Sequence, residues 1–313
     1  MRFDRGKRLN RELDYSVIIP TRNRPLQLSR CLSSLATLNY PQDRFEVLVI
    51  DDGSTHPLEP VIAGWNSRLP VRLLTQSHGG PARARNRGAR EASGRWLAFL
   101  DDDCEAAPGW LHGFGDTGAA PRELLGGATQ NGIPHRPCSV ASQILVEYVC
   151  RALWIQKDPL AFFPSNNLAV SREDFQRIGG FSERFPLAAA EDREFCYRWS
   201  KEGGHLSFRA DAVVGHFHHL TLRSFWRQHF NYGRGSHTFR QIRSADPRTR
   251  ARRRRGAFYM GLFLSSLRTG RGWTASRNLL LLMLSQVAYG FGFVYECHVS
   301  LRPTAKRKSG GIP

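Results

Sequence analysis

The chain has 313 residues, enough for one large α/β domain or a domain with an appendage, and its 41% hydrophobic and 23% charged residues argue against wholesale disorder. Its 45 Lys and Arg outnumber its 27 Asp and Glu, and the formal net charge of +18 should attract phosphate on a nucleic acid, an anionic lipid or a small molecule. Six cysteines without a C-x-x-C pair argue against a zinc knuckle or a disulfide framework and favour a reducing cytoplasm.

Short apolar runs alternate with amphipathic segments through the first hundred residues. The runs of strand length are YSVIIP, FEVLVI, VRLLT and RWLAFL, at 15–20, 45–50, 71–75 and 95–100. Helical patterns fill the gaps, at 25–38, 57–65 and 81–93. This alternation predicts an α/β fold with a parallel sheet and helices on both faces. The first apolar run is too short for a signal sequence, which favours a cytoplasmic protein.

From about residue 120 the pattern becomes mixed and predicts further strands and helices that complete the sheet and form a second pocket. ELLGGATQNG at 123–132 is typical of a strand, and SVASQILVEYVCRALW at 139–154 of a helix. SNNLAVSRE at 165–173 predicts a strand that runs into a helix, and EDREFCYRWSKEG at 191–203 a helix that ends at glycine.

The end of the chain combines an Arg-rich run at 240–255 with an uncharged segment, NLLLLMLSQVAYGFGFVY at 278–295. The segment is at the lower limit of length for a membrane-spanning helix, and Ser285, Gln286 and two glycines interrupt it. Two interpretations therefore stay open: a buried core helix, or a helix that lies on an anionic membrane surface.

Polar residues follow each of the first four expected strands, where ligands of open α/β sheets bind. The fourth strand runs into Asp101, Asp102 and Asp103, and such adjacent carboxylates are costly unless positive groups neutralise them. On an extended segment Asp101 and Asp103 would point the same way and Asp102 elsewhere. A hard divalent cation needs only one or two protein carboxylates, so the triplet predicts a metal site.

Two further segments belong to the same expected rim. VIDDGS at 49–54 places Asp51 and Asp52 where they could accept hydrogen bonds from a base or ribose, although Asp-Gly also favours a plain turn. HGGPARARNRG at 78–88 joins flexible backbone to a helix start that carries Arg85, which suits phosphate. The spacing matches neither a Walker loop nor a dinucleotide fingerprint.

Taken in order, seven segments resemble the inverting family 2 glycosyltransferases, which have the GT-A fold. They are VIIPTRNRP, VIDDGS, GGPARARNRG, FLDDDC, SNNLAVSRE, GGFSERF and EDREFCYRW. The resemblance implies a mixed central sheet flanked by helices, here with a helical C-terminal extension. The resemblance spans roughly residues 15–235 and implies a nucleotide-sugar donor together with Mn²⁺ or Mg²⁺. UDP is the commonest donor nucleotide of the family, so a UDP-linked sugar is expected. On this basis the expected parts are a basic tail at 1–14, a catalytic domain at 15–238, an Arg-rich linker at 239–256, an apolar helical segment at 257–300 and a basic tail at 301–313.

The resemblance also implies roles for individual residues. The positions implied to contact the donor or acceptor are Pro20, Thr21, Arg22, Asp51, Asp52, Arg85, Asp101, Asp102, Asn167, Glu191 and Arg234. Asp103 is the first choice for the metal ligand, with Asp101 and His216 beside it. Asp192 matches the catalytic base, and Glu191 is its rival because helical neighbours point about a hundred degrees apart. Inversion by direct displacement requires such a carboxylate opposite the leaving group.

Departures from related patterns narrow the expected function. The Q-x-x-R-W signature of processive synthases is missing, since Phe195 stands where the glutamine should be, so we expect transfer of a single sugar. The acceptor could be a glycan, a lipid-linked molecule or a small molecule, and an anionic membrane surface is a further expected partner. No specific nucleic acid is expected, because the basic segments lack interleaved aromatic residues. The alternative is a nucleotidyltransferase acting on a sugar phosphate, which also places a D-x-D motif near a nucleotide.

Overall fold

The structure is a computed structural model that describes residues 13–115, 122–185, 187, 189–244, 246, 255–268 and 272–301. The chain divides into two compact units. The first comprises residues 1–130, 163–182 and 198–217, and the second comprises 131–162, 183–197 and 218–313. Most of the tails expected at 1–14 and 301–313, and the centre of the Arg-rich linker, lie outside the described residues.

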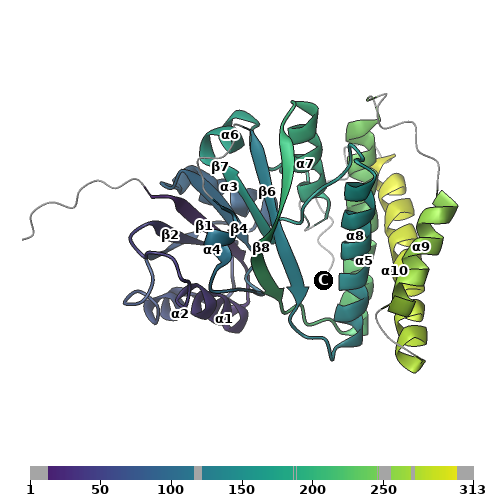
Figure 1. Cartoon of the computed structure of the whole chain (residues 1–313), viewed down its shortest axis with the longest axis horizontal. Helices are drawn as coiled ribbons and strands as arrows, with labels where there is room; N and C mark the ends of the chain where they lie inside the picture. Colours follow the sequence, from purple (N-terminus) through teal and green to yellow (C-terminus); the bar gives the residue numbers. More distant parts are fainter. Residues whose placement is uncertain are drawn as a thin grey trace, which may run out of the picture. The chain divides into compact units, whose positions relative to one another are not determined.

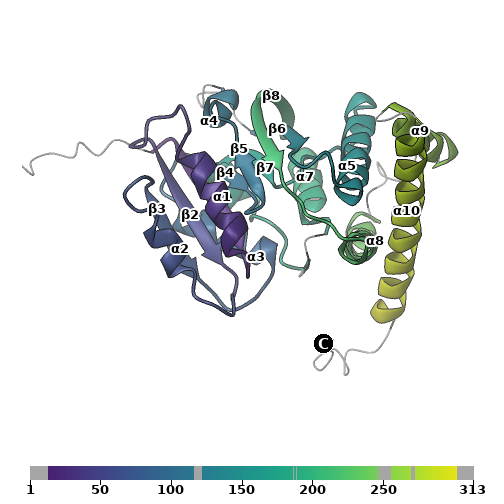
Figure 2. The same ribbon diagram turned by 90° about the horizontal axis from the view of Figure 1, so that it is seen from below.

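The first unit contains an eight-stranded sheet in the order β3-β2-β1-β4-β7-β6-β8-β5 (Figures 1 and 2). Its strands are β1 (Tyr15–Thr21), β2 (Phe45–Asp51), β3 (Val71–Thr75), β4 (Trp96–Leu100), β5 (Cys104–Ala106), β6 (Glu123–Asn131), β7 (Asn167–Ser171) and β8 (His205–His216). The strands β1 to β4 are parallel, as their alternation with helices predicts. β7 runs antiparallel to both β4 and β6, and β5 antiparallel to β8, so the sheet is mixed.

Helices of the first unit cover both faces of the parallel part of the sheet. They are α1 (Pro25–Leu35), α2 (Glu59–Ala63), α3 (Pro81–Glu91), α4 (Trp110–Gly113) and α6 (Arg172–Arg177). Proline at the first position starts α1 and α3, where its fixed φ suits a helix and its missing N–H costs nothing. On one face α1 packs on the odd-numbered residues of β1. On the other, α3 approaches closely at Gly88, where a Cβ would lie 2.6 Å from Cγ2 of Ile18.

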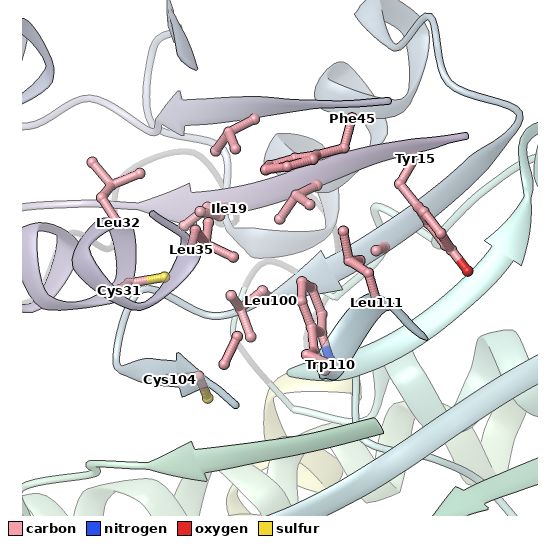
Figure 3. Packing of buried hydrophobic residues seen from close by; sticks show 14 of the residues in the cluster. Tyr15, Ile19, Cys31, Leu32, Leu35, Phe45, Leu100, Cys104, Trp110 and Leu111 are labelled. Carbon is pink, nitrogen blue, oxygen red and sulfur yellow. The ribbon is translucent and has the colours of Figure 1, made fainter. Parts of the chain in front are cut away.

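The main hydrophobic core lies between α1, α4 and the sheet (Figure 3). Strands β1 and β2 are buried along nearly their whole length, which explains why their sequences are continuous apolar runs. Trp110 and Phe114 of the α4 region pack edge to face, with ring centroids 5.7 Å apart, and close this core beside Tyr15. The core thereby fixes the carboxyl ends of β1, β2 and β4.

The second unit is helical in its described residues. Its helices are α5 (Pro137–Ile155), the start of α7 (Glu191–Lys201), α8 (Leu222–Arg243), α9 (Arg255–Arg268) and α10 (Trp273–Ser300). α8 begins with a capping box between Thr221 and Ser224. It then crosses α10 closely (Figures 1 and 2), because a Cβ at Gly233 or Gly292 would overlap the backbone of the opposite helix.

Candidate active site

The three carboxylates that follow β4 lie in a turn, which corrects the expectation of an extended segment. The amide of Cys104 donates to the carbonyl oxygen of Asp101 at 3.0 Å and closes the turn. The two-residue alternation that would point Asp101 and Asp103 the same way therefore does not apply. Instead Asp102 and Asp103 share one partner and Asp101 has another.

Two guanidinium groups neutralise the acidic turn. Nη1 of Arg24 lies 2.9 Å from Oδ1 of Asp102 and 3.1 Å from Oδ2 of Asp103. Nη2 of Arg85 lies 2.6 Å from Oδ1 of Asp101. Arg85, which was expected to contact the donor, is itself buried. Sequence reasoning missed Arg24, although it lies in the turn after β1, at the same rim of the sheet.

Asp102 is the most enclosed carboxylate of the turn. Its Oδ2 accepts a hydrogen bond from Oγ1 of Thr21 at 2.7 Å, and its side chain is 5% exposed. Burial, together with the neighbouring charge of Asp103, raises the pKa of Asp102 to about 6. The guanidinium of Arg24 acts in the opposite direction and lowers this pKa. Thr21 and Asp102 thus link the end of β1 to the end of β4, which fixes the position of Asp103.

Asp103 meets His216 at the edge of the sheet. The pairing of β5 with β8 places Cys104 opposite His216, and Nε2 of His216 lies 3.4 Å from Oδ1 of Asp103. Burial lowers the pKa of His216, but the carboxylates of Asp103 and Asp101 together outweigh burial, so the pKa of His216 is raised. One ligand atom each from Asp103, Cys104 and His216 lie within 4.8 Å of one another.

This cluster fits a divalent cation through two of its three members. Carboxylate oxygen and imidazole nitrogen together suit Mn²⁺ better than Mg²⁺, which prefers an all-oxygen site. Burial raises the pKa of the Cys104 thiol well above its usual value, so at neutral pH Cys104 carries its proton and is a poor ligand. Asp101, expected as a second metal ligand, stands outside the cluster and pairs with Arg85.

The ends of β1 and β2 form the neighbouring part of the rim, next to Pro20. Nε of Arg22 donates to the carbonyl oxygen of Gly53 at 3.3 Å, and Oδ1 of Asp51 accepts from the amide of Ser54 at 2.9 Å. Gly53 has φ +77°, a conformation that side chains disfavour. The turn after β2 is therefore held against the turn after β1.

Asp52 holds the loop that leads from β3 to α3. Its buried carboxylate accepts hydrogen bonds, all at 2.8 Å, from Nε2 of Gln76, Nδ1 of His78 and the amides of Gly79 and Gly80. A carboxylate has about four lone-pair sites, so these donors use its capacity. Contact with a base would require one of the two side-chain donors to move.

Asn167 does not face a ligand pocket, contrary to the expectation from sequence. It is 1% exposed; its Nδ2 donates to the carbonyl oxygens of Ala128 and Ala212, and its Oδ1 accepts from Nε1 of Trp110. These bonds join β6, β7, β8 and α4 inside the sheet. The preceding residue, Asn166, instead lies beside the metal cluster, with Nδ2 3.7 Å from Sγ of Cys104.

In the second unit, Glu191 and Asp192 open helix α7. Glu191 is 4% exposed, whereas Asp192 is partly exposed, and the amide of Arg193 donates to Oδ1 of Asp192 at 2.7 Å. Ala190 precedes them with φ +72°, an uncommon conformation for a residue with a side chain. Of the two acidic neighbours, Asp192 is therefore the one a solvent-borne hydroxyl can reach. Arg234, expected at a phosphate, pairs with Glu296 at 2.8 Å.

Comparison with known proteins agrees with the fold described above. A model described as glycosyl transferase family 2 matches residues 16–115, and one described as the N-terminal domain of galactosyltransferase matches 155–221. The mannosyltransferase PcManGT from Pyrobaculum calidifontis, solved with GDP-Man and Mn²⁺, superposes with a TM-score of 0.65 at 16% identity, over 92% of this chain and 88% of that one. At such identity the likeness shows the fold alone.

Two curated relatives share more sequence. Validoxylamine A glucosyltransferase of Streptomyces hygroscopicus subsp. limoneus is 32% identical over 217 residues, which cover 60% of this chain and 48% of the relative. Pre-mycofactocin glycosyltransferase of Mycobacterium tuberculosis is 29% identical over 284 residues, covering 88% and 57%. The chain thus spans about half the length of the curated relatives it matches.

The mixed sheet, with its acidic turn and histidine at one edge, has the GT-A architecture of the nucleotide-diphospho-sugar transferases. The two family models match residues 16–115 and 155–221, and they leave 116–154, with β6, unmatched. By these matches the chain is similar to the family 2 glycosyltransferases, whose model covers residues 16–115.

Proposed function

We propose that the protein transfers a single sugar from a nucleoside-diphosphate sugar, UDP-linked, to an acceptor hydroxyl with inversion at the anomeric carbon. The observation that carries the proposal is the Asp103–His216 pair at the carboxyl edge of a GT-A sheet, with Asp102 and Thr21 fixing the acidic turn. A metal bound there would neutralise the departing diphosphate. Asp103 and His216 would hold the metal, and Asp101 and Arg85 would border the donor.

Asp192 is the proposed general base. Its carboxylate would take the proton of the acceptor hydroxyl as that oxygen attacks the anomeric carbon and the bond to the diphosphate breaks. Support comes from its partial exposure next to buried Glu191, and from the left-handed backbone at Ala190 that sets the start of α7. Glu191 would stabilise the helix start by its favourable position near the positive end of the helix dipole.

Support for a nucleotide sugar also comes from relatives and neighbours. Structures solved with GDP-Man and Mn²⁺, and of Staphylococcus aureus TarS with UDP-GlcNAc at a TM-score of 0.51 and 14% identity over 92% of each chain, share the fold. The names of the two curated relatives give them validoxylamine A and pre-mycofactocin as acceptors. Both family models describe glycosyl transfer, so nucleotidyl transfer to a sugar phosphate is not proposed as a second function.

The direct test is calorimetric titration of the protein with UDP- and GDP-linked sugars, with and without Mn²⁺. We expect one donor to bind in a metal-dependent way, and Asp103→Asn to weaken that binding about 100-fold. Asp211→Asn is the matched control, because Asp211 is an exposed carboxylate on β8, the strand that carries His216. Donor binding that is equal without Mn²⁺ and in Asp103→Asn would contradict the proposal.

A further inference from the structure

Helix α10 exposes a continuous apolar stripe. The residues of this stripe are Trp273, Leu280, Met283, Val287, Phe291, Val294 and Tyr295, with exposed fractions between 41% and 78%. From Leu280 to Val294 they follow one another at steps of three or four, and Tyr295 lies four residues after Phe291. The other exposed residues of α10 are Ser276, Gly290 and His298, so no Lys, Arg, Asp or Glu stands on the exposed face. A helix face that normally meets water carries charged side chains, and this one does not.

The neighbouring helix has the same character. α9 packs against α10 (Figures 1 and 2) and exposes Tyr259, Met260 and Leu264. Isolated exposed apolar residues are normal on proteins, but contiguous ones mark an interaction surface. One side of the uncharged segment at 278–295 is apolar because it packs inside the second unit. Its other side is apolar although it is exposed.

The inner side of α10 is fastened to the protein. Leu282, Ser285 and Ala288 are buried, and Glu296 pairs with Arg234 of α8. α8 carries five arginines along its length, namely Arg223, Arg227, Arg234, Arg240 and Arg243. Drawing α10 into the hydrocarbon of a bilayer would bring α8 and these charges with it, at high cost. If α10 lay along the surface of a bilayer, its apolar stripe would contact lipid while its inner side stayed packed on the protein.

Basic segments bracket the helix pair in the sequence. Between residues 239 and 313 there are 15 Lys and Arg against two acidic residues, so this quarter of the chain carries +13 of the net +18. Residues 248–255 lead into α9, and Lys306, Arg307 and Lys308 follow α10. Clusters of this kind next to an amphipathic helix attract anionic lipid headgroups.

We propose that the apolar stripe of α10, with the exposed residues of α9, lies in the headgroup region of an anionic lipid bilayer. The net +13 of residues 239–313 would favour binding to lipid phosphates. Charge favours this occupant over a second copy of the chain, because each copy carries a net charge of +18 and two copies would repel one another. Anionic lipid faces the cytoplasm on the inner leaflet of cell membranes, which places the protein there.

The test is flotation of the full chain with vesicles of 30% phosphatidylserine in phosphatidylcholine, and with pure phosphatidylcholine. We expect flotation with the anionic vesicles to exceed that with the neutral ones about tenfold. The triple variant Leu280→Gln, Val287→Gln, Phe291→Gln should lose about tenfold of it. The matched control makes the same change at exposed apolar residues elsewhere, Leu26→Gln, Phe208→Gln and Leu222→Gln, and should float like the parent chain.

Three outcomes would overturn the proposal: equal flotation of the stripe variant and the parent, a control variant that loses as much as the stripe variant, or sedimentation showing a dimer that only the stripe variant abolishes. Should the triple variant not fold, Trp273→Phe serves instead, because Trp273 is 78% exposed at the start of the stripe. Brominated lipid should quench the fluorescence of the parent chain more than that of Trp273→Phe. Equal quenching of the two would count against the proposal.

Discussion

The two units differ most in how they treat charge. The first contains 22 Lys and Arg against 19 Asp and Glu, a net +3, whereas the second contains 23 against eight, a net +15. In the first unit, the carboxylates that end β4 are paired with Arg24 and Arg85, so charge is balanced locally. In the second, basic residues outnumber their acidic partners almost threefold and accompany an exposed apolar stripe.

This difference separates two possible roles of positive charge that the net charge of the sequence does not distinguish, namely binding of a small donor and binding of an extended anionic surface. A nucleoside diphosphate is small, and the proposed site at the sheet edge would bind it with a few placed groups on a nearly neutral unit. The overall basicity of the chain belongs to the helical unit, where it matches an extended anionic surface better than a single ligand. The net charge of +18 therefore says little about the donor.

The largest expected effect lies in the chemistry assigned to the second unit. Asp192→Asn should lower turnover about 1000-fold while leaving affinity for the donor within about twofold, because the amide cannot accept the proton of the acceptor. Kinetics of sugar transfer, combined with donor titration, measure both quantities. A loss of donor binding equal to the loss of turnover would assign Asp192 to the donor instead.

Packing between α8 and α10 offers the next largest effect. Gly292→Ala would push a Cβ into the carbonyl oxygen of Phe230, and should destabilise the second unit by about 3 kcal/mol. Gly290→Ala, on the exposed side where nothing lies within 4 Å, should instead stabilise α10 by up to about 1 kcal/mol. Urea unfolding of the two variants compares them, and similar midpoints would refute the close approach of the helices.

We expect acidic pH to lower the folding stability of the second unit because of the buried side chain of His229. This side chain of α8 is 1% exposed and packs against Phe225 with ring centroids 4.3 Å apart. Burial lowers its pKa to about 4, and His218 contributes in the same direction. Because the unfolded value is near 6.5, the folded state binds fewer protons between these values, and stability present above pH 6.5 is lost as the pH falls through 4.

His229→Phe should therefore remove up to about 3 kcal/mol of the loss in stability between pH 7 and pH 4. Urea midpoints measured at both pH values give the difference. His219→Phe is the control, because His219 is an exposed histidine of the same unit and should leave the pH dependence unchanged. An unchanged pH dependence in His229→Phe would show that another group controls the acid response.

The smallest expected effect concerns the local balance of charge in the first unit. Arg24→Gln should tighten binding of Mn²⁺ alone about threefold, since Arg24 contacts Asp102 and Asp103 but is 45% exposed and partly screened. Paramagnetic resonance of free Mn²⁺ reports the affinity. Arg30→Gln, an exposed position on α1, serves as control. Weaker binding in Arg24→Gln would mean that Arg24 chiefly positions the carboxylates.

The order of strands and helices was predictable because β-branched runs and amphipathic segments are local signals. The antiparallel direction of β7 was not, since no local pattern encodes how a strand pairs. The same limit applies at the site. Arg24 and Asp102 are 78 residues apart, and the turn at 101–103 looks extended in sequence. Composition alone revealed an apolar C-terminal helix, but which of its faces is exposed depends on Gly233 and Gly292.

The carboxylate of Asp52 has a consequence for how a nucleobase would enter. Two of its four donors are the backbone amides of Gly79 and Gly80, and two are the side chains of Gln76 and His78. The two amides can hold the carboxylate of Asp52 in place while one of the two side chains moves away. An imino N–H of the incoming base could then donate to the carboxylate in place of that side chain. Binding of the base would then replace one hydrogen bond of Asp52 with another, with little net change in the number of hydrogen bonds. The main cost would be lost conformational entropy of the side chains. Hydrogen exchange at Gly79 and Gly80 should accordingly stay slow whether or not nucleotide is present.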